Sequence, residues 1–369
     1  MKIAIIANTS WNIYNFRLGL AQALIKEGHE VLAISPNDEY SSGFSSSCIQ
    51  HIPIDIEARG SNPFKDLRLI YRFYAIFKTH KPDLLLQYTI KPNIYGTLAA
   101  KFRGIPCINN VSGLGTVFLH DNLTSKIAKA LYKLAFSYPH KVFFQNKEDQ
   151  KLFINMGLVN EFRTGLVPGS GINLIKFKPV LTNKKNPQQE FVFITVARLL
   201  YDKGIKEYAE AAEVLKNEGI KARFQILGAL DKNPSLGIPE EWINKWQKKG
   251  IIEYLGFCDQ VIEYMAKADC VVLASYREGT PKSLLEALAL GKPVIATDVP
   301  GCKDTVVNGV NGYICKAKDP ADLADKMKKM ISLDESDHWN MGLESRKLAE
   351  EKFDEKIVIQ KYLEEIKNI

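Results

Sequence analysis

The segment 276–294, which reads YREGTPKSLLEALALGKPV, constrains the possible fold more than any other stretch of the chain. It follows an apolar run at 270–274 that predicts a short buried strand. We expect a loop over 276–281 and a helix over 283–290, because Pro281 suits a helix start and a glycine follows the last helical residue. A strand that leads into a helix start is typical of a parallel α/β sheet. In such sheets ligands bind at the carboxyl edge, and anions bind at the helix N-terminus.

Two acidic residues of this segment are candidates for ligand binding. Glu278 lies in the predicted loop, and Glu286 lies about one turn into the helix. With a diphosphate at the helix start, both carboxylates could accept hydrogen bonds from hydroxyl groups, as sugar recognition requires. The alternative is that Glu278 is a solvated loop residue and Glu286 a charge on the helix surface.

The length of 369 residues favours two domains of ordinary size. The polar segment TNKKNPQQE at 182–190 reads as a linker, so we expect one domain over 1–180 and a second over 181–350. The amino-terminal MKIAIIANTS reads as a buried strand rather than a signal peptide, and no apolar run is long enough to span a bilayer. The six cysteines form no CxxC pair, which favours reduced thiols in the cytoplasm and argues against a zinc site.

The net charge of +7 is concentrated in the first half of the chain. Residues 1–180 hold 21 lysines and arginines against 12 acidic residues, whereas the remainder holds 28 against 30. Two predicted helices, 62–79 and 125–137, carry basic stripes beside aromatic residues, at Lys65, Arg68 and Arg72 and at Lys126, Lys129 and Lys133. Such stripes fit helices on an anionic membrane surface, and they also fit the solvated outer face of a core helix. No recognised nucleic-acid-binding motif is present, so nucleic acid is not a predicted partner.

The first half opens with a pattern that predicts a parallel sheet. Strands at 3–7 and 31–34 enclose a loop at 8–15 and a helix at 16–27, and the loop lacks the GxGxxG of dinucleotide-binding proteins. Later strand ends should open on the same edge. The candidate acceptor-binding residues at this edge are Asn8, Tyr14, Arg17, Lys91, Gly113 and Gly115. Arg17 could face an anionic acceptor or be a surface arginine, and the glycines could admit a ligand or simply form turns.

A strand predicted at 191–197 begins the second half. It is followed by Arg198 and Lys203, and Gly204 then precedes a helix. Two cations at a strand end, opposite a helix N-terminus, would neutralise a leaving nucleoside diphosphate without a metal ion.

These segments together resemble the family-4 retaining glycosyltransferases. The resemblance rests on EGTPKSLLEALALGKPV, on ARLLYDKG and on VPGSGIN. The stretches YNFRLGL and VPGC are most similar to bacterial enzymes that build lipid-linked oligosaccharides or surface polysaccharides. The resemblance implies an α/β fold of the GT-B type, in which two Rossmann-like doubly wound domains face each other across a cleft. It also implies that a C-terminal helix at 351–369 crosses back to the first domain.

The resemblance assigns roles to individual residues. Glu278 would contact the donor sugar, Glu286 the ribose, and Arg198 with Lys203 the donor diphosphate. Lys91 lies near a position where relatives often carry a histidine, so it would be a cation near the leaving diphosphate or the acceptor. Glu278, Lys91, Arg198 and Lys203 are therefore the predicted catalytic set. The rest of the predicted donor site is Gly169, Gly171, Gly256, Phe257, Gly279, Thr280, Lys282 and Ser283.

The implied reaction is transfer of a sugar, of the N-acetylhexosamine type, from a UDP-sugar to a polyprenyl-diphosphate-linked saccharide. The bond would form with retention, without a metal ion and without a cofactor other than the donor. The protein would be cytoplasmic and peripheral on the inner face of the cell membrane. Two alternatives remain: a UDP-sugar 2-epimerase on the same architecture, and a catalytically silent nucleotide-sugar-binding scaffold. The identity of the sugar, the accepting hydroxyl and the oligomeric state are left open.

Overall fold

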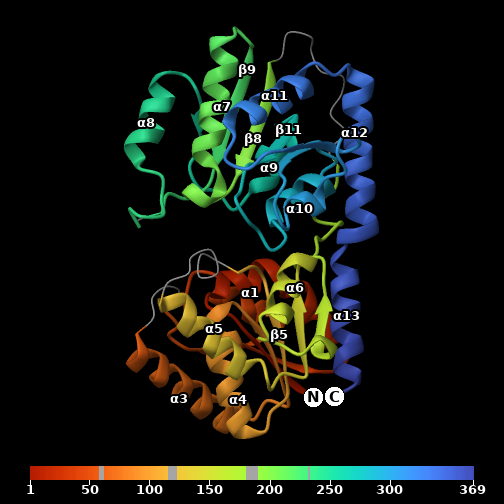
Figure 1. Cartoon of the computed structure of the whole chain (residues 1–369). Coiled ribbons are helices and arrows are strands. Elements are labelled where there is room, and N and C mark those ends of the chain that lie inside the picture. Colours follow the sequence, from red (N-terminus) through yellow and green to blue (C-terminus); the bar gives the residue numbers. More distant parts are fainter. Residues whose placement is uncertain (58–61, 115–122, 180–189, 232) are drawn as a thin grey trace. The chain divides into compact units, whose positions relative to one another are not determined.

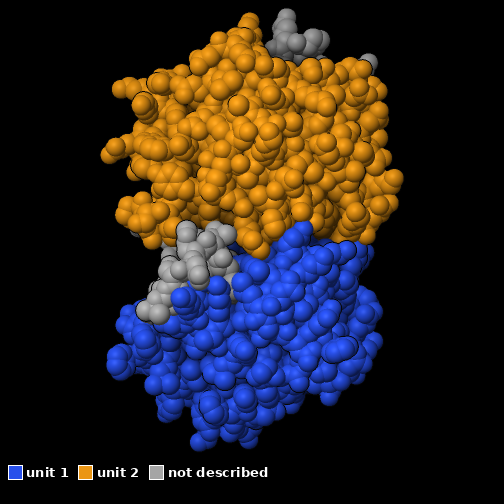
Figure 2. All heavy atoms as spheres, in the orientation of Figure 1, with its two compact units in different colours: residues 1–171, 355–369 blue, residues 172–354 orange. Residues whose placement is uncertain are grey.

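The computed structural model describes all residues except 58–61, 115–122, 180–189 and 232 (Figure 1). The chain forms two compact units (Figure 2), one of residues 1–171 with 355–369 and one of residues 172–354. The sequence predicts one domain boundary after residue 180, which lies outside the described residues, and a second after residue 350.

Unit 1 contains a sheet of seven parallel strands in the order β3-β2-β1-β4-β5-β6-β7. The central strands are apolar at nearly every position because helices cover both faces of the sheet. The strand order reverses direction between β1 and β4, and this switch point is where ligands bind in doubly wound sheets. The strands are β1 (Lys2–Ile6), β2 (Glu30–Ser35), β3 (Gln50–Pro53), β4 (Leu84–Tyr88), β5 (Cys107–Val111), β6 (Lys141–Phe144) and β7 (Thr164–Leu166).

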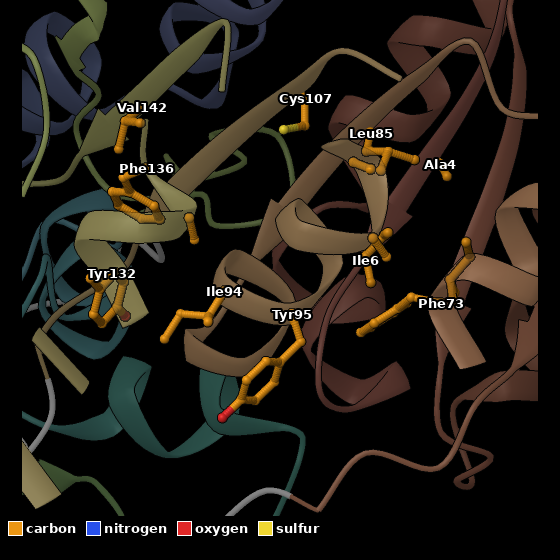
Figure 3. Close-up of a cluster of buried hydrophobic side chains, with 14 of the residues drawn as sticks. Ala4, Ile6, Phe73, Leu85, Ile94, Tyr95, Cys107, Tyr132, Phe136 and Val142 are labelled. Carbon is orange, nitrogen blue, oxygen red and sulfur yellow. The ribbon is translucent and has the colours of Figure 1, made fainter. Parts of the chain in front are cut away.

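Helices on the two faces of this sheet enclose two separate apolar cores. One core includes Phe73 of α3 and Tyr132 of α5 (Figure 3), and the other includes Leu20 of α2 and Tyr362 of α13. The helical segments of unit 1 are α1 (Ser10–Phe16), α2 (Leu18–Lys26), η1 (Ser41–Ser47), α3 (Pro63–His80), η2 (Pro92–Gly96), α4 (Thr97–Arg103), α5 (Leu123–Ala135), α6 (Lys147–Asn155), η4 (Glu161–Arg163) and α13 (Glu355–Lys367).

The start of the first helical region differs from the sequence prediction. The predicted loop at 8–15 is largely helical, because the Oγ1 atom of Thr9 accepts the Asn12 N–H at 3.1 Å and begins α1 at Ser10. Arg17 is the C-cap residue of α1 and the N-cap residue of α2, so the predicted helix at 16–27 is the second of two. The prediction for α3 is confirmed, since the Asn62 side chain caps that helix by accepting the N–H groups of Phe64 and Lys65, the second and third residues after it.

Unit 2 repeats the same arrangement with six parallel strands in the order β10-β9-β8-β11-β12-β13. Its switch point lies between β8 and β11. The strands are β8 (Phe191–Val196), β9 (Ala222–Leu227), β10 (Glu253–Tyr254), β11 (Cys270–Leu273), β12 (Val294–Thr297) and β13 (Gly312–Cys315). The helical segments are η5 (Tyr201–Lys203), α7 (Ile205–Asn217), α8 (Glu240–Lys248), α9 (Val261–Lys267), α10 (Lys282–Ala289), η6 (Lys303–Thr305), α11 (Pro320–Ile331), α12 (Glu335–Leu348) and η7 (Ala349–Phe353). The predicted α/β class with two Rossmann-like units is confirmed.

The helix α13 packs in unit 1 although it follows all of unit 2 in the chain. Its residue Tyr362 is fully buried, and its hydroxyl accepts a hydrogen bond from the Asn110 Nδ2 atom at 3.1 Å. Lys361 donates to the carbonyl oxygen of Leu166 at 2.7 Å. Across the described part of the chain, no helix is both long and apolar enough to cross a membrane.

Candidate active site

The predicted donor residues of unit 2 lie at its switch point. Arg198 and Lys203 follow β8, and Glu278 follows the neighbouring strand β11. The structure brings two of them into contact, since the Lys203 Nζ atom is 2.5 Å from the Glu278 Oε1 atom. The Ser275 hydroxyl donates to the same Oε1 atom at 2.7 Å. Two donors therefore fix the orientation of Glu278: Ser275 from its own loop after β11, and Lys203 from the segment after β8.

Two glycines allow the neighbouring loops to approach this carboxylate closely. Gly204 has a φ of +68°, and a Cβ atom there would lie 2.1 Å from the carbonyl oxygen of Ala274. Gly301 has a φ of +81°, and a Cβ atom there would lie 2.2 Å from the carbonyl oxygen of Gly279. Any other residue at either position would push a loop away. Gly301 is not among the predicted site residues, because the sequence Pro300-Gly301 by itself predicts only a turn.

Burial strengthens the Lys203–Glu278 pair. The two side chains are 18% and 16% exposed, so water screens their charges weakly. Burial alone would favour the neutral lysine, but the Glu278 carboxylate outweighs it and raises the pKa of Lys203 above its usual value. The family resemblance implies separate tasks for these residues, the diphosphate and the sugar, and nothing in the sequence predicts that they touch.

Arg198 is the exposed cation of the site. Its side chain is 61% exposed, and its Nη1 atom is 4.0 Å from the Asp231 Oδ2 atom, at the limit of an ion pair. Such a guanidinium can turn toward a diphosphate and bind two of its oxygens at once. Arg198 and Lys203 thus present one accessible and one buried positive charge after the same strand.

Glu286 lies on α10, about one turn after the start of that helix. Burial raises the pKa of Glu286 to about 7, although the positive charges of Lys282 and Lys176 oppose the shift. Pro281 is the N-cap residue of α10, and no side chain forms the cap hydrogen bond. A helix start of this kind can offer its first N–H groups to an anion. Gly279, Thr280, Lys282 and Ser283, which the sequence placed in the donor site, surround this helix start. The titration of Glu286 near neutral pH was not predicted.

The loop after β10 carries Gly256 and Phe257, two residues of the predicted donor site. The carbonyl oxygen of Gly256 accepts the N–H of Gly228 at 2.8 Å, and Phe257 is 59% exposed. A Cβ atom at Gly228 would lie 1.8 Å from the carbonyl oxygen of Ala197, just before Arg198. The strand ends of β8, β9 and β10 are therefore held together at the carboxyl edge of the sheet.

In unit 1, Arg17 lies at the switch point between β1 and β4. Its guanidinium carbon is 4.0 Å from the centre of the Tyr88 ring, the last residue of β4, and the whole residue is 4% exposed. Its Nε atom has no hydrogen-bond partner among the described residues. The next residue after β4, Thr89, has a φ of +68°, which is strained for a residue other than glycine. Arg17 is thus a buried cation and not the surface arginine of the alternative interpretation.

Lys91 has a buried partner that the sequence does not predict. Its Nζ atom is 3.0 Å from the Asp66 Oδ1 atom, and the two side chains are 13% and 10% exposed. Burial and a hydrogen bond to Asp66 raise the pKa of Tyr95, which is labelled in Figure 3. Asp66 compensates the lysine charge, so Lys91 in this state is one member of an ion pair.

The other predicted site residues of unit 1 differ from one another in position and in contacts. Tyr14 packs against the ring of Tyr40, with 5.8 Å between their centres. A Cβ atom at Gly171 would lie 2.4 Å from the Cα atom of Glu355, so this glycine admits the start of α13. Asn8 and Gly113 follow β1 and β5 at the carboxyl edge, Gly169 has a φ of +65°, and Gly115 lies outside the described residues.

No group of three or more His, Cys, Asp or Glu side chains suited to a metal ion occurs among the residues that the structure describes. The predicted metal independence remains a prediction.

Comparison with known proteins identifies the family. Residues 179–347 match the model of glycosyl transferases group 1, and residues 2–146 match that of glycosyl transferase 4-like proteins. A relative from Campylobacter jejuni is 31% identical, and the alignment covers 98% of this chain and 97% of the relative. The chain therefore belongs to the group 1 glycosyltransferases, which confirms the predicted glycosyltransferase family, while retention of configuration remains a prediction.

The relatives carry informative names. The Campylobacter jejuni protein is an N,N'-diacetylbacillosaminyl-diphospho-undecaprenol alpha-1,3-N-acetylgalactosaminyltransferase. The capsular polysaccharide biosynthesis glycosyltransferase CapM of Staphylococcus aureus is 26% identical over 92% of this chain and 90% of its own. The structure of Anabaena HepE in complex with UDP-glucose superposes with a TM-score of 0.82 at 18% identity and covers both chains fully. These comparisons favour the glycosyltransferase over the epimerase and the silent scaffold.

Proposed function

We propose that this glycosyltransferase moves an N-acetylhexosamine from UDP to a polyprenyl-diphosphate-linked saccharide, with retention at the anomeric carbon. The substrate class follows that of the Campylobacter jejuni relative, which aligns with nearly the whole chain. The observation that carries the proposal is the buried Lys203–Glu278 pair beside the exposed Arg198, at the switch point of unit 2. This arrangement suits a ligand with a diphosphate at one end and hydroxyl groups at the other.

The proposed chemistry needs only positioning and charge. The bond between the anomeric carbon and the diphosphate oxygen breaks, while the acceptor hydroxyl forms its bond on the same face of the sugar. The acceptor proton passes to the departing phosphate oxygen. Arg198, Lys203 and the N–H groups at the start of α10 would stabilise the negative charge on the diphosphate, so neither a metal ion nor a further cofactor is required.

Glu278 would position the sugar rather than attack it. Its Oε1 atom already accepts hydrogen bonds from Lys203 and Ser275, which lowers its reactivity as a nucleophile, whereas an oriented carboxylate can still accept a hydrogen bond from a sugar hydroxyl. Glu286 would accept hydrogen bonds from the ribose.

Arg17 is the proposed contact for the diphosphate of the acceptor. Arg17 is buried and its Nε atom has no hydrogen-bond partner among the described residues, which is costly for a charged group, and a phosphate would reduce that cost. The Lys91–Asp66 pair would support the same edge of the sheet. Because such an acceptor is anchored in lipid, we place the enzyme on the cytoplasmic face of the cell membrane.

The test is UDP release by the purified protein over a panel of UDP-sugars, with and without a polyprenyl-diphosphate-linked saccharide. We expect release that depends on one UDP-N-acetylhexosamine and on the acceptor, that survives EDTA, and that yields a product with the anomeric configuration of the donor. Arg198→Ala and Lys203→Ala should each lose at least about a hundredfold in kcat/KM. Lys206→Ala, a matched control that removes an exposed lysine of α7, should retain activity.

Acceptor-independent hydrolysis alone, a product of inverted configuration, or full activity of both variants would each contradict a stated part of the proposal.

A further inference from the structure

The helix α3 has two apolar faces. Its inner face, which includes Phe73 and Phe77, is buried in the core of unit 1. Its outer face carries three more large apolar side chains at helical spacing, which are 87%, 67% and 71% exposed: Phe64, Leu67 and Tyr71. A solvated outer helix face carries polar residues at such positions, so this second stripe is not needed for folding.

The neighbouring helix extends the apolar surface. Phe102 of α4 is 74% exposed, and α3 and α4 lie side by side in unit 1 (Figure 1). An open groove of about 670 Å³ lies between them, and Arg68 is the one charged residue among its described lining residues. We call the surface formed by Phe64, Leu67, Tyr71 and Phe102 the aromatic face.

The charge around the aromatic face is predominantly positive, although Glu57 pairs with Lys65 and Asp55 with Arg72 on α3. The helices α3, α4 and α5 together contain nine lysines and arginines but one acidic residue, Asp66. That aspartate is buried and paired with Lys91, so it does not offset the surface charge. On α5, Ile127 and Leu134 are also exposed, at 51% and 54%. Apolar side chains on helices with an excess of cations match the acyl boundary and the phosphates of an anionic bilayer.

We infer that the aromatic face docks unit 1 on an anionic membrane, with its apolar side chains among the lipid head groups and Arg68 and Lys101 near the lipid phosphates. A protein partner would have to present an acidic rim of matching shape, whereas a bilayer supplies both features without further specificity. The inference rests on the proposed function, because a lipid-linked acceptor is found only at a membrane surface. It identifies which surface of the chain meets that membrane.

The test is binding of the full-length protein to vesicles of neutral phosphatidylcholine, with and without 30% anionic phosphatidylglycerol. This fraction is roughly that of a strongly anionic leaflet. We expect binding to the anionic vesicles to weaken roughly tenfold or more in Phe64→Gln/Tyr71→Gln. Arg68→Glu/Lys101→Glu should lose binding and also its dependence on the anionic lipid. All four side chains are exposed on helix surfaces, so thermal unfolding should be unchanged.

Matched controls remove the same chemical groups elsewhere in unit 1. Phe162→Gln removes an aromatic ring that is 94% exposed, and Lys151→Glu reverses an exposed charge on α6. Both controls should bind as the wild type does. Equal loss in the controls, or full binding by both aromatic-face variants, would overturn the inference.

A water-soluble acceptor with a short chain separates this inference from the proposed function. We expect the aromatic-face variants to use it at the wild-type rate while losing activity on acceptor embedded in vesicles. Activity on the soluble acceptor with no vesicle binding by the wild type would refute the membrane face and leave the reaction standing. Vesicle binding with no transfer to either acceptor would refute the proposed reaction. A dimer that the aromatic substitutions dissociate would instead assign the face to a second copy of the chain.

Discussion

Changing Glu286 to glutamine should abolish a pH dependence of donor binding that the wild-type protein shows. If the ribose hydroxyls donate to this residue, only its carboxylate form binds well. With a pKa of about 7, about a tenth of the residue is ionised at pH 6 and about nine tenths at pH 8. The apparent Kd for the donor should therefore be about tenfold tighter at pH 8 than at pH 6.

The assay is isothermal titration calorimetry with a UDP-N-acetylhexosamine between pH 5.5 and 8.5. A UDP-sugar is preferable to UDP, because the terminal phosphate of UDP itself titrates at a pH of about 6. Glu286→Gln should bind more weakly at pH 8 and show no slope, whereas His338→Gln should keep the wild-type slope. A flat wild-type profile, a slope of opposite sign, or the same slope in Glu286→Gln would refute the assignment of the ribose to this carboxylate.

The same pKa shift acts on stability. The pKa of Glu286 in the folded protein is above its ordinary value of 4.5, so the folded state holds the extra proton between pH 4.5 and about 7. Stability therefore falls as the pH rises through this window, by up to about 3 kcal/mol. Glu286→Gln should unfold at a higher temperature than the wild type at pH 8 and at the same temperature at pH 4.

Three further substitutions test the packing around the sites. Lys203→Ala removes the cation beside a buried carboxylate and should lower the free energy of unfolding by about 3 kcal/mol, whereas the double variant with Glu278→Gln should recover part of that loss in denaturant titrations. Gly204→Ala should abolish activity and cost several kcal/mol in the same titrations, while Gly219→Ala, at a similar φ with open space around it, should cost only about 1 kcal/mol. Asp66→Asn should cost about 2–4 kcal/mol and weaken acceptor use, measured as KM for the acceptor, without changing UDP binding.

The sequence predicts the framework of the donor site well because its signals are local. An apolar run, a proline and a glycine define β11, the Glu278 loop and α10 within about 20 residues. The contact between Glu278 and Lys203 joins residues 75 positions apart. It depends on Gly204 lying against the end of β11, which no local pattern encodes.

Two other features show the same limit. The segment of α1 is rich in aromatic residues and asparagine, which are weak helix formers, so the sequence does not predict this helix. Its first residue, Ser10, is held instead by hydrogen bonds to Ser35 and to the carbonyl oxygen of Pro36, both at 2.7 Å. On α3, the sequence reveals basic and aromatic residues but not which of them face the core. The structure resolves this by burying Phe73 and exposing Phe64 and Tyr71.

The position of α13 determines the order in which the two units can be completed. A ribosome makes all of residues 172–354 before it makes Tyr362, whose ring lies 5.0 Å from that of Phe143 and 6.2 Å from that of Tyr88. Until then, one core of unit 1 is open to water on the side that α13 covers. Unit 2 is a continuous stretch and needs no later segment, so it can finish folding first. Damage to residues 355–369, though remote in sequence, would therefore destabilise the unit that begins the chain.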